Sequence, residues 1–233
     1  ILWFGWFGFN AGSALGANAL AASAFVVSQA AAAAATVSWV LMEWKFNGKP
    51  TVLGAVSGCI AGLVAITPAA GFVEPLPAII IGLIGGGICY FAVAVLKDKL
   101  GYDDSLDAFG IHGIGGTWGS LATGLWATTG VNPAGANGLF YGETDLFVAQ
   151  VISTVVAYAL AIVGTFILFK IVSAICDVRA DESEELAGLD IVEHGERGYG
   201  RSVVGGTIMG SFEDSSEMLA NTVMKVNAKG GTI

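Results

Sequence analysis

Long uncharged stretches, separated by short charged segments, run through the first three quarters of this chain. Five stretches lack any charged side chain, at residues 1–42, 50–73, 75–96, 108–142 and 146–169. A helix needs about 20 apolar residues to cross the hydrocarbon core of a bilayer, so the first stretch is long enough for most of two crossings. Small and polar residues between Asn10 and Ala21 indicate the turn between those two. We therefore expect about six membrane-spanning helices, at residues 1–15, 20–42, 51–68, 77–97, 107–127 and 146–171.

The composition supports an all-α, polytopic membrane helix bundle. Of 233 residues, 55% are hydrophobic and only 12% are charged, and the mean hydropathy is +0.73. Soluble domains carry about 25% charged residues, so a soluble protein would have to bury every apolar stretch in one small core. The 34 glycines are also typical of membrane helices, in which small residues let backbones approach closely.

The basic residues predict the orientation of the bundle. Lysines follow the second and fourth expected spans, and the remaining basic residues close or follow the sixth. The loops after the first, third and fifth spans contain no Lys or Arg. The ten basic residues are Lys45, Lys49, Lys97, Lys99, Lys170, Arg179, Arg197, Arg201, Lys225 and Lys229. The positive-inside rule therefore places these loops and the carboxy-terminal tail in the cytoplasm.

The end of the chain differs from the rest, and we divide the sequence into a membrane region, residues 1–175, and a tail, residues 176–233. More than half of the 19 acidic residues lie in the tail, which accounts for most of the net charge of −9. Such a run is typical of a solvated, loosely ordered segment, with a short helix expected near Ser215–Val226. The chain has no basic patch, so we expect no nucleic-acid partner.

The chain opens with ILWFGWFGFN, already inside an apolar span, with no Met, no flanking charge and no signal peptide. A native membrane protein seldom begins in the middle of a helix. We therefore expect further membrane spans upstream of Ile1.

His112 is the candidate for chemistry within the membrane region. An ionisable side chain at membrane depth is expensive, and it indicates either a functional group or a structural histidine bonded to a backbone carbonyl. An imidazole held neutral can both donate and accept hydrogen bonds, which suits the passage of a small polar solute or a proton. Glycines around it favour the functional interpretation, because they allow other helices or a pore to come close. They are Gly110, Gly113, Gly115, Gly116 and Gly119.

An aromatic cluster at the start of the chain is the second candidate. Trp6, Phe9 and Ser13 lie three and four residues apart, so they share one helical face. Aromatic faces can stabilise a cation, and a neighbouring hydroxyl can accept a hydrogen bond from an ammonium group. Spacing alone favours the simpler interpretation, an interfacial aromatic belt with ordinary packing.

Other signals of chemistry are weak. Cys59, Cys89 and Cys176 fit no metal-ligand or disulfide spacing and suit small buried positions. The glycine run at 85–87 lies inside an expected span, where it favours helix packing over a nucleotide site. With no nucleophile, metal cluster or phosphate-binding loop, we expect neither an enzyme nor a bound metal or cofactor.

Three motifs resemble the ammonium transporter (Amt/Rh/MEP) family. They are WFGFNAGSALGAN at 6–18, DAFGIHGIGGTWGSLATG at 107–124 and GLDIVEHGERGYG at 188–200, and their order and spacing are similar to the family's. The resemblance covers residues 1 to about 200. It implies that these are spans six to eleven of an eleven-span transporter, followed by the family's cytoplasmic segment.

The resemblance also implies roles for single residues. His112 resembles the second of two pore histidines, and Phe9 one of two stacked phenylalanines at the outer gate. Ser13 is similar to the hydroxyl of an outer ammonium-recruiting site, and Trp6 to a pore-lining aromatic below the gate. The partner histidine, the second phenylalanine, a recruiting tryptophan and a structural aspartate would lie upstream.

For the tail, the resemblance implies packing on the cytoplasmic face, contact with a neighbouring subunit and binding of a PII-family regulatory protein. The residues that carry this are Gly188, Leu189, Asp190, His194, Gly195, Glu196 and Tyr199. Gly198 stands where alanine is expected in many relatives. Residues 201–233 resemble nothing in the family, and their role stays open.

The function that the resemblance implies is ammonium transport across the plasma membrane by a homotrimer, each subunit moving ammonia and a proton through its own pore. Methylammonium is a further possible substrate. The alternative is an ammonium sensor on the same scaffold that signals through the tail. A channel for neutral solutes is a third option, which would not need His112.

Overall fold

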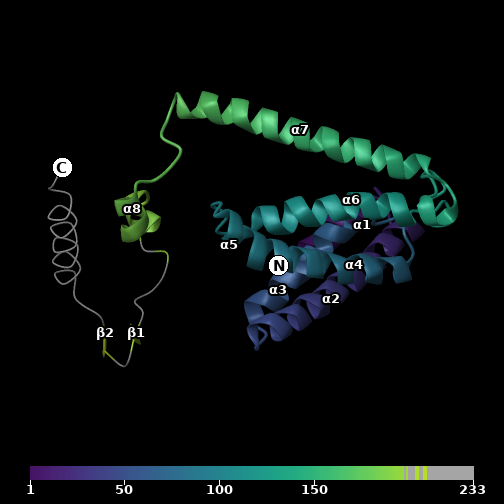
Figure 1. The fold of residues 1–233 in the computed structure, drawn as a ribbon, viewed down its shortest axis with the longest axis horizontal. Coiled ribbons are helices and arrows are strands. Elements are labelled where there is room, and N and C mark those ends of the chain that lie inside the picture. Colours follow the sequence, from purple (N-terminus) through teal and green to yellow (C-terminus); the bar gives the residue numbers. More distant parts are fainter. Residues whose placement is uncertain (197, 199–202, 205–206, 209–233) are drawn as a thin grey trace. The chain divides into compact units, whose positions relative to one another are not determined.

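A computed structural model describes residues 1–196, 198, 203–204 and 207–208, and these are mainly helical (Figure 1). Tyr199 and the helix expected near Ser215–Val226 lie outside these residues. The chain divides into two compact units, Ile1–Phe166 and Ile167–Ile233. The division falls inside a long helix, close to the expected end of the membrane region.

Every expected span coincides with a helical segment, and the all-α prediction is confirmed. Three of these helices are long and apolar enough to cross a membrane, at Ala19–Asn47, Pro75–Leu100 and Asp145–Ser173. The helix at Pro75–Leu100 is continuous and includes a π-helical segment. The elements from the start of the chain to the last of these three helices are α1 (Leu2–Gly12), α2 (Ala19–Asn47), α3 (Val52–Ile66), α4 (Pro75–Phe91), η1 (Ala92–Leu96), α5 (Lys97–Leu100), η2 (Phe109–Gly113), α6 (Ile114–Trp126), η3 (Leu139–Tyr141) and α7 (Asp145–Ser173).

The ends of α2 and α3 differ slightly from the prediction, for local reasons. Helix α2 continues past residue 42, because a charged side chain at a helix end does not stop the helix. It ends at Asn47, before Gly48, whose φ of 78° is the left-handed conformation that glycine adopts without strain. Helix α3 ends at Ile66 rather than 68, because Pro68 has no N–H group with which to continue the helical hydrogen bonds.

Small residues bring α2, α3 and α4 into close contact. A Cβ added at Gly62 of α3 would lie 2.4 Å from the carbonyl oxygen of Ala31, and one at Gly82 of α4 would lie 2.3 Å from the same atom. Both helices thus pack against the backbone of α2 at one point. The surrounding core is apolar and includes Val27, Ile66 and Ile81, all fully buried. Helices α1 and α6 pack against this group (Figure 1).

A buried carboxylate fixes the turn between α2 and α3. Glu43 is only 8% exposed, and its oxygens accept hydrogen bonds from the Thr51 N–H at 2.8 Å and the Thr51 hydroxyl at 2.9 Å. The Thr51 oxygen in turn accepts the Gly54 N–H at 2.8 Å and caps α3. Buried polar groups need such partners, and here they are supplied within one turn.

The tail contains more regular structure than its composition indicated. It holds α8 (Glu182–Ala187), α9 (Leu189–Val192) and two short antiparallel strands, β1 (Val203–Val204) and β2 (Thr207–Ile208). Helix α8 begins with a capping box, in which Asp181 and Glu184 each bond the other's backbone. Such a box stabilises a short helix by satisfying two N–H groups that would otherwise lack partners.

Candidate functional site

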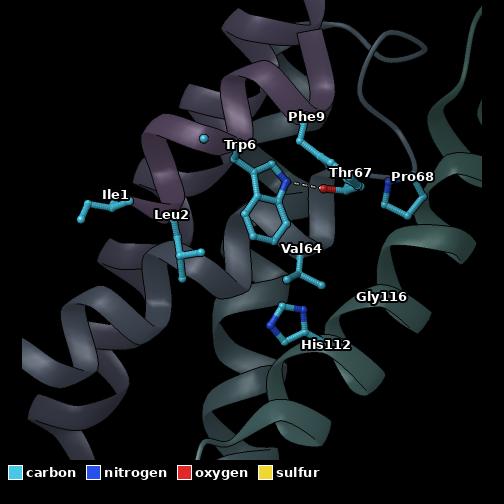
Figure 2. A pocket seen from close by; sticks show the side chains of 10 residues that line it. Ile1, Leu2, Trp6, Phe9, Val64, Thr67, Pro68, His112 and Gly116 are labelled. Atoms are coloured by element: carbon cyan, nitrogen blue, oxygen red, sulfur yellow. Dashed lines mark hydrogen bonds between the residues drawn. The ribbon is translucent and has the colours of Figure 1, made fainter. Parts of the chain in front are cut away.

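A cavity of about 590 Å³ opens between α1, α3 and the start of α6 (Figure 2). Its walls are mainly apolar and are contributed by segments more than 100 residues apart in sequence. Residues that line it include Trp6, Phe9, Val64, Thr67, His112 and Gly116. The structure thus brings three of the four predicted site residues, Trp6, Phe9 and His112, to one cavity.

The Trp6 indole lies at the centre of this group. Its ring stacks near His112, with ring centroids 6.3 Å apart and planes 24° apart. Phe9 meets the same indole edge to face at 6.0 Å. The indole Nε1 donates a hydrogen bond of 2.7 Å to the Thr67 hydroxyl, which donates in turn to the Leu63 carbonyl. The tryptophan is therefore held in one orientation from the α3 side (Figure 2).

His112 lies on the π-helical segment η2 rather than on a regular α-helix. Such π-bulges are rare and occur frequently at functional sites. Within the part of the chain that the structure describes, its imidazole has no hydrogen-bond partner. His112 is exposed and lines the cavity. Both ring nitrogens remain able to bond a solute in the cavity.

The glycines around His112 have two different tasks. A Cβ at Gly110 would lie 2.8 Å from Val93, and one at Gly119 would lie 2.3 Å from the Ala65 carbonyl oxygen. These two positions let neighbouring segments approach. Gly116 instead lines the cavity, where an added Cβ would meet nothing within 4 Å. The sequence suggested that these glycines let either other helices or a pore come close. Both occur, but at different glycines.

Two aspartates hold the start of η2. The Asp104 carboxylate accepts the N–H groups of Ala108 and Phe109, both at 2.9 Å. Lys97 donates to the Asp107 carboxylate at 2.6 Å and to the Asp104 carbonyl at 3.0 Å. Asp107 is one of two non-glycine residues with positive φ among those described, at 56°. Together these bonds connect the start of α5 to the segment that carries His112.

The sequence profile of the Ammonium Transporter Family matches residues 1–199. The chain belongs to the ammonium transporter family. Among its relatives, the ammonium transporter of Bacillus subtilis (strain 168) is 58% identical over 199 residues, which is 85% of this chain and 49% of that protein. The chain thus spans about half the length of the curated relatives it matches, which are named as transporters.

Solved structures of this family have the same fold. Mep2 of Saccharomyces cerevisiae is 40% identical to this chain and superimposes with a TM-score of 0.68. The aligned region is 72% of this chain and 38% of the Mep2 chain. A protein described as a sensor Amt protein is 27% identical, with a TM-score of 0.70 over 82% of this chain and 46% of its own. The expected membrane transporter architecture is thereby confirmed.

In this member of the ammonium transporter family, Ser13 is set apart from the other predicted site residues. It lies at the end of α1, exposed, and it is not among the cavity-lining residues. Its hydroxyl donates to the Phe9 carbonyl at 2.7 Å. The single hydroxyl proton is used in that bond, so its oxygen lone pairs are left to accept a bond from outside.

Thr67, Val64 and Pro68 line the cavity and were not predicted from the sequence. All three lie in an apolar stretch that reads as an ordinary span. The pair Thr67–Pro68 was the available signal, because a proline ends the helix and leaves a hydroxyl at its terminus. Only the approach of α1 shows that this hydroxyl accepts the indole N–H.

In the tail, Asp190 organises the turn that contains most of the predicted regulatory residues. Its carboxylate accepts the N–H groups of Ile191 at 3.0 Å and Gly198 at 2.8 Å. Gly188 and Gly195 have φ of 97° and 65°, which explains glycine at both positions. Leu189 begins α9, and His194 and Glu196 are exposed. A Cβ at Gly198 would lie 3.7 Å from Asp190, an ordinary contact, so the alanine expected from the family fits here as well.

Proposed function

We propose that the protein carries ammonium across a membrane and that the cavity beside Trp6 forms one wall of the conduction path. The observation that carries this proposal is the row of Phe9, Trp6 and His112 along one apolar cavity. An aromatic mouth above an imidazole suits a cation that can give up a proton. The opposite wall, with a partner histidine and a second gate phenylalanine, belongs to the upstream half of the protein.

The proposed mechanism separates the ion into two parts. Ammonium binds at the outer aromatic face, where ring quadrupoles attract the cation and the Ser13 oxygen accepts an N–H bond. The apolar walls penalise passage of the intact charge by several kcal/mol. One N–H bond then breaks, neutral ammonia crosses, and the released proton passes by way of the His112 imidazole. Potassium has no proton to release, so the same walls exclude it.

Further parts of the proposal concern the surroundings of the pore. We place the protein in the plasma membrane with its tail in the cytoplasm, because the basic residues gather on that side. A homotrimer and a PII-family regulator that binds the tail follow from family membership. Chemical cross-linking of the complete protein in membranes tests the homotrimer. Co-purification with a PII protein tests the regulator.

The direct test of transport uses the complete protein in liposomes on a solid-supported membrane. A pulse of ammonium should evoke a transient current, whereas the same concentration of potassium should evoke a far smaller one. Equal currents for the two ions would contradict the proposed selectivity. Binding of ammonium without any current would instead favour the sensor described below.

Thr67→Val should weaken ammonium transport by about three- to tenfold, the range that the loss of one hydrogen bond allows. The variant removes the acceptor of the Trp6 indole and frees the ring to turn in the cavity. Thr67→Ser is the matched control, because it keeps the hydroxyl. Initial rates in liposomes measure the effect, and a valine variant as active as the serine variant would show that the bond is dispensable.

A sensor on the same scaffold is the second candidate, favoured by the likeness to the sensor Amt protein. In a sensor, ammonium binding would change the tail and a signalling partner while little solute passes. The ordered Asp190 turn in the tail is compatible with either role.

Ending the complete protein after Ile175 should lower ammonium current several-fold while the thermal stability of the membrane region stays unchanged. The tail is expected to couple to transport and to its regulator rather than to hold the bundle together. Ending the chain after Ile208 is the matched control, because it keeps α8, α9 and the Asp190 turn. Normal current and normal regulation in the shorter variant would remove the tail from the mechanism.

A further inference from the structure

Helix α7 presents one polar face to α6. Gln150, Thr154 and Tyr158 follow one another at intervals of four, so they lie on the same side of α7. The Ser120 hydroxyl donates to the Gln150 side chain at 2.8 Å and lies 2.9 Å from the Thr154 hydroxyl, which also has the Gln150 backbone carbonyl as an acceptor at 2.7 Å. Tyr158 bonds Thr117 of α6 at 2.6 Å. Most other side chains of α7 are apolar and exposed, so these bonds are specific to one face.

The bond made by Tyr158 differs from the others because it reaches η2. Thr117 donates its hydroxyl proton to the Gly113 carbonyl at 2.7 Å. With that proton directed at the carbonyl, Tyr158 donates to Thr117; if Thr117 instead donates to Tyr158, the Tyr158 hydroxyl can itself donate to the Gly113 carbonyl. The Tyr158 oxygen lies 3.4 Å from that carbonyl. A continuous path of hydrogen bonds therefore runs from α7 through Thr117 to the last residue of η2.

Gly113 directly follows His112, so a shift of the Gly113 peptide group also moves the His112 backbone, which determines where the imidazole points. The imidazole itself has no hydrogen-bond partner among the described residues, and its orientation therefore depends on that backbone. Asp104 holds the start of η2, and the Thr117–Tyr158 pair holds its end. Without the second attachment, a π-helical segment can relax toward regular α-helix, which would rotate His112 along the cavity wall.

We propose that Tyr158 is a positioning residue for His112, acting through Thr117 and the Gly113 carbonyl. The inference rests on the proposed transport function, and it extends that function to a helix outside the cavity. A purely structural role of Tyr158 would resemble that of Thr154, which joins the same two helices one turn away without touching η2.

The test compares four variants of the complete protein in liposomes, each checked for thermal stability. Tyr158→Phe removes only the hydroxyl, and Thr117→Val breaks the same path from the side of α6. Thr117→Ser keeps the path, and Thr154→Val removes a comparable bond between α6 and α7 elsewhere. The readout is the ratio of ammonium-evoked to potassium-evoked current, which a general loss of folded protein does not change.

We expect the ratio to fall about three- to tenfold in Tyr158→Phe and Thr117→Val, the range for one lost hydrogen bond. Thr117→Ser and Thr154→Val should keep the ratio of the unaltered protein. If Tyr158→Phe does not fold, Thr117→Val decides between the two roles. An unchanged ratio in the variants that break the path, or an equal fall in Thr154→Val, would overturn the positioning role while leaving transport intact. No selectivity in the unaltered protein would instead overturn the proposed function, and this inference with it.

Discussion

Replacing His112 by alanine is expected to reduce ammonium-evoked current about a hundredfold, the lower end of what a positioned proton-transfer group contributes. The imidazole is the titratable side chain at the cavity, and it lies beside the Trp6 ring. Without it, a proton released from ammonium loses the acceptor that this half of the path supplies. Solid-supported membrane currents with ammonium and then potassium measure both the rate and the selectivity.

A second variant separates two ways in which His112 could act. His112→Gln keeps a hydrogen-bond donor and acceptor of similar size, but it cannot take up a proton near neutral pH. If proton relay is the task, glutamine should be as inactive as alanine. If the side chain only bonds the passing ammonia, glutamine should restore most of the current. Unaltered current and selectivity in both variants would show that His112 is structural.

Replacing Gly82 by alanine is expected to lower the free energy of unfolding by about 1–3 kcal/mol, the usual cost of forcing atoms into a well-packed interior. The new methyl group would lie 2.3 Å from the Ala31 carbonyl oxygen and 2.8 Å from the Ala31 Cα. Both atoms belong to the backbone of α2, which cannot turn aside as a side chain can. Helices α2 and α4 would therefore have to separate.

The matched control for this prediction is Gly87→Ala on the same helix. Its added methyl would meet only the Ser38 hydroxyl oxygen, at 3.6 Å, an ordinary contact. Both variants gain the same intrinsic helix propensity, so that contribution cancels in the comparison. Thermal unfolding of the detergent-solubilised protein should show a lower midpoint for Gly82→Ala alone. Equal midpoints would mean that the interface between α2 and α4 accommodates the added methyl group without loss of stability.

Several features of the fold could be predicted because they depend on residues that are neighbours in the chain. Absence of charge over some 20 residues identifies a membrane span wherever it occurs. The predicted helix ends were less accurate where a single residue determines the end of a helix, as Gly48 does for α2 and Pro68 for α3. The π-helical segments η1 and η2 were not predicted, since an extra residue in a helical turn leaves no mark in an apolar sequence.

The site was predicted in part, and the reason lies in which residues have unusual chemistry. A histidine at membrane depth and a dense aromatic cluster are conspicuous in any apolar sequence. Thr67, Thr117 and Tyr158 are ordinary residues for a membrane helix, and their roles arise only from what they face. Their partners come from other helices, so no spacing within one helix reports them.

The amino-acid sequence by itself determined that this chain is a membrane helix bundle, that it belongs with ammonium transporters, and that His112 and Trp6 were its main candidates. Such conclusions follow from local composition, because the bilayer acts on each segment separately. The tertiary structure decided that Trp6 and His112, 106 positions apart in sequence, stack on each other and line one cavity. It also decided that Ser13 lies outside that cavity. It also decided which glycines allow contact and which line the path. Those outcomes depend on how closely two helices approach, and the approach is set by packing among many residues rather than by any single motif.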